Sequence, residues 1–307
     1  MEQINWIVTS GKAEVEDNII RYKSEVYKNQ LGKEEILTAC VKSNVEFDNG
    51  EISFKLNSSN QYGRCYIFFS DDDGSMILIG LINVINGLYG IAELKNNNFK
   101  PLSITGLSET FQINKEYDFT IKVYGSQIDL YVNGVLVAKA YRQINKSQIT
   151  FFFSSSLGDI SVKNIIINTK KSKAFIVMQF TDEYNHLYSE VIKPVVEESG
   201  FECERADEAY TTNPILQDII QSIRESSIII ADITPNNPNV FYEVGYAHAI
   251  NMPTILLCDR KREELPFDIS GFRTLFYDNT IAGKTAIEKD LRKYLKNQIN
   301  NVSNQIK

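Results

Sequence analysis

The sequence has 307 residues and a formal net charge of −7, with 43% hydrophobic and 23% charged residues. This composition is that of a globular protein and excludes disordered, collagen-like and coiled-coil chains, while the length predicts two domains. The acidic balance excludes bulk binding of nucleic acid, which requires clustered Lys and Arg.

Cysteine usage and the N-terminal segment indicate the compartment. The four cysteines are too few for a disulfide framework and lack metal-ligand spacing. The N-terminal segment is charged where a signal peptide needs an apolar run, and no apolar run approaches the ~20 residues that cross a bilayer. We therefore expect a cytoplasmic protein that binds neither a membrane nor a metal.

Residues 1–168 have the pattern of short β-strands separated by turns. Asn133-Gly134 lies between the alternating runs QIDLYV and VLVAKAY, and predicts a hairpin with a type I′ turn, whose two central residues need positive φ. Many short strands with such turns predict an antiparallel, jelly-roll-like β-sandwich as the N-terminal domain.

The pattern changes after a polar linker at residues 169–172. From 173 to 300, apolar strands alternate with helical segments. The expected strands are 174–178, 201–205, 227–232, 254–258 and 273–277. Apolar strands that alternate with helices indicate a parallel sheet covered on both faces, so we predict a flavodoxin-like α/β domain here.

Ligands of an open parallel sheet bind beyond the carboxyl ends of its strands. Gln179 and Phe180 follow the first strand, Asp207 follows the second, and Asp232 ends the third. We expect these side chains to meet in one crevice. Phe180 would stack on a ligand or fill the core, and Asp207 would bind a ribose hydroxyl or remain solvated in its loop.

The segment ADITPNNPNVFYEVGYAHA predicts a loop and then a helix that runs from Val240. Asn239 is the expected N-cap, since its side chain can accept from free amides of the first turn. Val244 and Ala247 continue an inward stripe from Val240. Glu243 is expected in the first turn beside this stripe, ionised at neutral pH through the helix dipole.

An ionised carboxylate in a crevice can attack or stabilise a sugar C1 that develops positive charge during cleavage of a glycosidic bond. Glu243 is the candidate for this role, and Asp232 is the candidate to orient or protonate the leaving base. Tyr246, one turn further along, is a candidate to line the crevice. The alternative is structural, because acids also suit first helical turns and strand ends.

From Lys173 to about Asp278 the chain resembles the nucleoside 2-deoxyribosyltransferase-like family, which is related to the Toll/interleukin-1 receptor (TIR) domains that cleave NAD. The matching segments include AFIVMQF, ILQDIIQSIRESSIIIADIT, NPNVFYEVGYAHAINMPTILL and PFDISGFRTLFYD. The most specific element is E-x-G-x-A, which begins at Glu243. The resemblance implies that Glu243 is the catalytic nucleophile and that Asp232 contacts the base.

The chain departs from this family at Asn237, where the transferases usually carry an Asp. A neutral amide can hydrogen-bond a sugar or base but supplies no charge. The resemblance therefore favours hydrolysis of a nucleotide, with NAD as substrate rather than cofactor, and implies a homo-oligomeric antiviral defence effector of bacteria. Two alternatives stay open: a non-catalytic nucleotide sensor and a nucleoside 2-deoxyribosyltransferase.

The N-terminal half more loosely resembles the concanavalin/laminin-G-like sandwich, through the segments YDFTIKVYGSQIDLYVNGVLVA and ISVKNIIIN. Such modules bind glycans, proteins or copies of themselves. The resemblance implies a recognition or assembly role for this domain.

Overall fold

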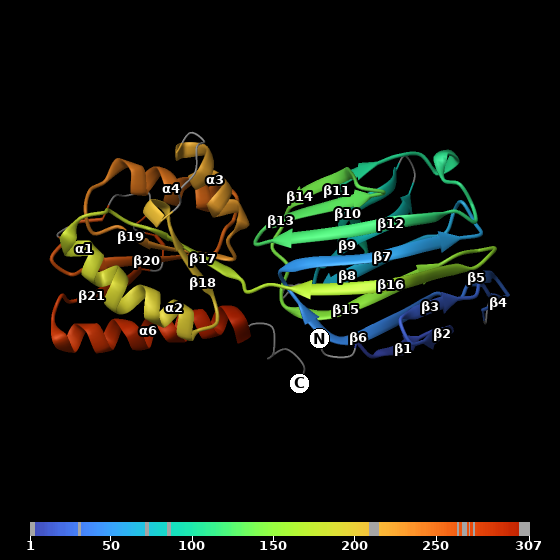
Figure 1. The fold of residues 1–307 in the computed structure, drawn as a ribbon, viewed down its shortest axis with the longest axis horizontal. Helices are drawn as coiled ribbons and strands as arrows, with labels where there is room; N and C mark the ends of the chain where they lie inside the picture. Colours follow the sequence, from blue (N-terminus) through green and yellow to red (C-terminus); the bar gives the residue numbers. More distant parts are fainter. Residues whose placement is uncertain are drawn as a thin grey trace. The chain divides into compact units, whose positions relative to one another are not determined.

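The structure is a computed structural model. It describes residues 4–29, 32–70, 74–84, 87–208, 215–262, 264–265, 269, 271–272 and 274–300. The chain forms two compact units: the first extends to Lys170 without Tyr124–Ser126, and the second consists of Tyr124–Ser126 and the chain from Lys171 onward (Figure 1). Among the described residues, no helix is both long and apolar enough to cross a bilayer.

The N-terminal unit is an antiparallel β-sandwich, as predicted. Within the described residues its two sheets have the strand orders β1-β6-β15-β8-β9-β10-β11 and β14-β13-β12-β7-β16-β3-β2, and β4 pairs with β5 separately. The strands are β1 (Trp6–Ser10), β2 (Ala13–Glu16), β3 (Ile19–Tyr22), β4 (Val26–Lys28), β5 (Glu34–Ile36), β6 (Ala39–Phe47), β7 (Gly50–Ser58), β8 (Arg64–Ser70), β9 (Met76–Val84), β10 (Gly87–Lys95), β11 (Asn98–Thr105), β12 (Glu116–Tyr124), β13 (Gln127–Val132), β14 (Val135–Tyr141), β15 (Ser147–Ser154) and β16 (Ile160–Thr169).

Alternation of apolar and polar residues along strands such as β7 gives each sheet of this sandwich a face that joins the core. In β7 every second residue is fully buried, so one face of the strand joins the core. Phe54 of β7 stacks on its register partner Phe119 of β12, with ring centroids 5.3 Å apart, and meets Phe151 of β15 edge-on at 5.1 Å. The predicted hairpin is confirmed, because Asn133 and Gly134 both have positive φ between β13 and β14.

The C-terminal unit is the predicted parallel α/β sheet, with the strand order β18-β17-β19-β20-β21. The strands are β17 (Lys173–Val177), β18 (Glu202–Arg205), β19 (Ile228–Asp232), β20 (Thr254–Asp259) and β21 (Thr274–Tyr277). The expected fifth strand began at Arg273, which lies outside the described residues. The helices are α1 (Asp182–Leu187), a π-helical turn (Tyr188–Ile192), α2 (Lys193–Glu198), α3 (Ile215–Glu225), α4 (Pro238–Ala249) and α6 (Ile281–Asn300).

Helices cover both faces of this sheet, which is why its inner strands β17, β19 and β20 are mainly apolar, whereas the edge strand β18 carries two glutamates and an arginine (Figure 1). Ile228 and Ile230 of β19 pack in the core shared with α1, α2 and α6. Ile229 and Ala231 pack in the core shared with α3 and α4. The alternation along β19 therefore decides which helices each of its side chains meets.

Candidate functional site

The strand order places a topological switch point at the carboxyl end of β17, which pairs with β18 on one side and β19 on the other. The loops after β17 and β19 meet there. The side-chain amide of Asn237 donates from Nδ2 to Oε1 of Gln179 at 3.4 Å. Two of the predicted binding residues are thus brought together at the place where such sheets bind ligands.

The helix α4 begins two residues earlier than predicted. Asn237 is its N-cap, and Oδ1 of Asn237 accepts from the backbone N–H of Asn239 at 3.0 Å. The prediction of Asn239 as the cap was therefore wrong, because Pro238 occupies the first helical position, which its fixed φ suits. The Asn239 side chain is exposed. Glu243 is consequently the sixth helical residue and not part of the first turn.

Glu243 is a half-buried carboxylate beside the inward stripe of α4. The stripe itself is confirmed, since Val240, Val244 and Ala247 are all buried. Burial raises the pKa of Glu243 from 4.5 to about 7, and no charged group contributes to this shift. At neutral pH the carboxyl is therefore about half ionised and not fully ionised as expected, because the side chain lies beyond the first helical turn and loses solvent. The side chain of Glu243 makes no hydrogen bond or ion pair with any residue that the structure describes.

Asp232 is fully buried at the end of β19 and held by a network of hydroxyls. Its Oδ1 accepts from the backbone N–H of Thr234 at 3.0 Å and from the hydroxyl of Thr234 at 2.5 Å. Its Oδ2 accepts from the hydroxyl of Tyr277 at 3.2 Å. Burial raises the pKa of Asp232 to about 6, against the lowering effect of these hydrogen bonds, and the nearby Asp259 raises it further.

Asp232 and Glu243 belong to different sides of the sheet. Asp232 continues the alternation of Ile228 and Ile230, and its partner Tyr277 packs in the core under α1, α2 and α6. Glu243 belongs to α4, which packs on the opposite core. Neither carboxylate affects the pKa of the other. The structure thus records no direct interaction between the two carboxylates, and their cooperation stays a prediction.

Phe180 and Asp207 lie around Arg205, which sequence reasoning did not select. Arg205 ends β18 and donates to both carboxylate oxygens of Asp207, at 2.6 and 2.7 Å. Its guanidinium lies 5.2 Å from the centroid of the half-exposed Phe180 ring and 4.1 Å from that of Tyr188. Arg205 also donates to Oδ1 of Asn185 at 2.9 Å. The sequence feature that could have identified Arg205 is an arginine at the end of a predicted strand, two residues before an aspartate.

Tyr246 packs against the core beneath α3 and α4. Its hydroxyl accepts a hydrogen bond from Nε of Arg224, on α3, at 2.6 Å. The polar end of Tyr246 is therefore engaged with the neighbouring helix.

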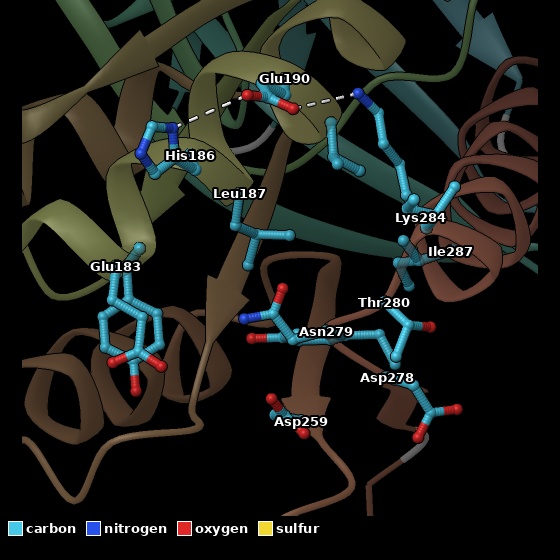
Figure 2. Close-up of a pocket in the computed structure, with 14 residues that line it drawn as sticks. Glu183, His186, Leu187, Glu190, Asp259, Asp278, Asn279, Thr280, Lys284 and Ile287 are labelled. Carbon is cyan, nitrogen blue, oxygen red and sulfur yellow. Dashed lines mark hydrogen bonds and ion pairs between the residues drawn. The ribbon is translucent and has the colours of Figure 1, made fainter.

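A cavity of about 510 Å³ lies on the other face, between α1, the π-helical turn, the start of α6 and the ends of β20 and β21 (Figure 2). Asp259 and Tyr277 belong to its lining, whereas Glu243 does not. Sequence reasoning placed no ligand here. Among the described residues, no group of three His, Cys, Asp or Glu side chains is arranged to hold a metal ion.

No protein-family model matches this chain, and no curated protein is similar to it in sequence. Solved structures resemble about half of the chain at low identity. A carbohydrate-binding module from Bacillus subtilis has 13% identity and a TM-score of 0.40, covering 52% of this chain and 92% of its own. A Bacillus licheniformis beta-glucanase has 16% identity and a TM-score of 0.38, covering 54% and 92%. No activity is carried over from these proteins, because function does not follow from fold.

Proposed function

We propose that the C-terminal domain cleaves the N-glycosidic bond of a nucleotide, with NAD⁺ as the substrate and water as the acceptor. The single observation that carries the proposal is the state of Glu243, a half-buried carboxylate with no side-chain partner among the described residues, whose pKa burial raises to about 7. Perturbed carboxylates at the ligand-binding edge of an α/β sheet are candidate catalytic groups.

The chemistry assigned to Glu243 uses its ionised form. As the bond between C1′ of the ribose and the nicotinamide nitrogen breaks, the bonding electrons leave with nicotinamide and positive charge develops on the sugar. A carboxylate with little solvent around it stabilises that charge more strongly than one in water. Water then adds to C1′ and loses a proton, giving ADP-ribose.

The separation of Glu243 from Asp232 favours NAD⁺ over a neutral nucleoside. Nicotinamide leaves NAD⁺ as a neutral molecule, so its departure needs no proton donor. A purine or pyrimidine leaves a neutral nucleoside as an anion unless an acid protonates it. Asp232, whose oxygens are occupied by Thr234 and Tyr277, is better suited to fix the loop after β19 than to protonate a base. A single carboxylate suffices for NAD⁺.

Gln179 and Asn237 provide neutral amides near the switch point, where they can bind the ribose or the carboxamide of nicotinamide. Phe180 offers a half-exposed ring, backed by Arg205, on which a base can stack. Asp207 is paired with Arg205, so its role in this scheme is to hold the guanidinium beneath that ring. The proposed contacts do not use Asn239, which is exposed, or Tyr246, whose hydroxyl bonds Arg224, and their roles stay predictions.

The experiment is chromatography of NAD⁺ incubated with the purified full chain, beside the Glu243→Gln variant. Nicotinamide release by the parent and its loss in the variant are expected, while binding of NAD⁺ to the variant persists because Gln keeps the shape. Binding without release by either protein would instead indicate the nucleotide sensor. Formation of a new nucleoside after addition of a free base would indicate deoxyribosyl transfer.

The roles implied for the rest of the chain are part of the same proposal. The sandwich would recognise a glycan or a protein, or drive assembly of a homo-oligomer, and the activity would serve defence by depleting a nucleotide. Light scattering tests the assembly directly. A monodisperse monomer with full activity would contradict it.

A further inference from the structure

The cavity between α1 and α6 has the size of a small-molecule site. Its volume of about 510 Å³ falls within the range of roughly 300–1,000 Å³ that ligand pockets occupy. Leu187 and Val191 line one wall, and Ile281 and Ile287 of α6 belong to the lining as well. In Figure 2, Leu187 lies between the polar groups at the two ends of the cavity.

The charged groups of this lining are mostly acidic. Lys284 lies 3.2 Å from Glu190, which also has His186 at 3.7 Å, so the charge of Glu190 is compensated (Figure 2). Asp278 lies 3.5 Å from Arg260, and both side chains are largely exposed. These two acids therefore have partners.

Two further acids of the lining have no cationic partner among the residues that the structure describes: Glu183 and Asp259. Asp259 ends β20 and is only 6% exposed. Its Oδ1 accepts from the backbone N–H of Lys261 at 2.9 Å. Asp259 also raises the pKa of the buried Asp232, so two carboxylates lie near each other at adjacent strand ends. Burying Asp232 and Asp259 in their ionised forms costs free energy unless a cation compensates their charge.

The two arginines that follow Asp259 in the sequence, Arg260 and Arg262, interact with other groups. The guanidinium of Arg262 donates to the backbone carbonyl oxygens of Ile233 and Thr234. It thus holds the loop after β19 and makes no ion pair with Asp259 in the described part of the chain. A phosphate in the cavity would face four carboxylates and one lysine, so this is not a nucleotide site.

We propose that this cavity binds a small organic cation, a protonated amine joined to an apolar body. The amine donates to the carboxylate of Asp259, and the apolar body packs against Leu187, Val191 and Ile287. Glu243 is not among the residues that line this cavity, so the proposal does not rest on the hydrolysis of NAD⁺.

The test is a ligand-observed NMR titration of the full chain with benzylamine, beside its neutral isostere benzyl alcohol. We expect a Kd for benzylamine below about 1 mM and at least tenfold weaker binding of the alcohol. Asp259→Asn keeps the shape and removes the charge, and should weaken benzylamine at least tenfold. Asp290→Asn is the matched control, expected to bind as the parent does because Asp290 of α6 is exposed and does not line the cavity.

A second variant covers the case in which Asp259→Asn fails to fold. Leu187 is half-buried, and Leu187→Lys places a cation at the apolar wall while its stem retains the packing. It should abolish benzylamine binding. Absence of binding to the parent, equal affinity for the alcohol, or undiminished affinity in both Asp259→Asn and Leu187→Lys would each overturn the proposal.

Discussion

The hydroxyl of Tyr277 donates a hydrogen bond to Oδ2 of Asp232 at 3.2 Å, although the two residues end strands that are not neighbours. Between them lies β20, and the hydroxyl of Thr234 contacts both side chains, at 2.5 Å from Asp232 and 3.1 Å from the Tyr277 oxygen. The Thr234 hydroxyl also accepts a hydrogen bond from the backbone N–H of Asp259 at 2.9 Å. Thr234 therefore ties together the carboxyl ends of β19, β20 and β21.

Replacing Tyr277 by Phe tests how much this hydrogen-bond network contributes to the stability of the domain. The variant keeps the ring in the core and leaves Oδ2 of Asp232 buried with one donor fewer. We expect a loss of about 1–3 kcal/mol in the free energy of unfolding at neutral pH, measured by urea denaturation. Tyr294→Phe is the matched control on α6, where a half-buried ring packs on the same core. Equal stability of the two variants would show that the bond to Asp232 contributes nothing.

Asp232 should make stability fall as the pH rises. Burial raises its pKa from 3.8 to about 6, so the native protein holds this proton more tightly than the unfolded chain does. The stabilisation is therefore complete below about pH 4 and lost as the pH rises through about 6, and the shift of about two pKa units corresponds to about 3 kcal/mol. The measurement is the difference in unfolding free energy between the parent and Asp232→Asn across this range. A difference that does not change with pH would contradict the assignment.

The local pattern of apolar residues predicted both domains. Alternate apolar residues indicate a strand buried on one face, and successive apolar residues indicate a strand buried on both faces. The parallel strands, the inward stripe from Val240 and the hairpin at Asn133 are all features of short segments. The contact between Asp232 and Tyr277 is not, since it joins residues 45 positions apart and depends on strand order. Which helices cover which face of the sheet depends on contacts between distant segments. The placement of Asp232 and Glu243 on different sides could therefore be seen only in the structure.

The helix start shows a narrower failure of sequence reasoning. Two asparagines flank Pro238, and either can cap a helix, but only one leaves the proline at the first helical position. Asn237→Ala should therefore cost about 1 kcal/mol of stability, through loss of the bond to the Asn239 amide. Asn239→Ala, at the exposed neighbouring position, should change stability by less than about 0.5 kcal/mol. Thermal unfolding of the two variants shows which asparagine caps the helix. A larger loss of stability in Asn239→Ala than in Asn237→Ala would contradict the observed cap.

The pH dependence of catalysis tests the state of Glu243. Since burial raises its pKa to about 7 and the proposed mechanism uses the carboxylate, kcat/KM for NAD⁺ should rise about tenfold per pH unit below pH 7 and level off above it. The quantity to measure is the initial rate of nicotinamide release at low NAD⁺ over this range. A rate that falls as the pH rises through 7 would assign the protonated form, and a flat profile would remove Glu243 from the chemistry.

Arg205 should matter for substrate binding more than for the chemical step. Its planar guanidinium contacts both oxygens of Asp207 and lies against the Phe180 ring, and a lysine can reproduce neither arrangement. Arg205→Lys should therefore raise KM for NAD⁺ several-fold with little change in kcat, because Phe180 loses its support while Glu243 is untouched. Glu243→Gln gives the opposite result, a loss of kcat with binding retained. Steady-state kinetics separates the two effects, and a fall in kcat alone for Arg205→Lys would place the guanidinium with the reacting atoms instead of beneath the stacked base.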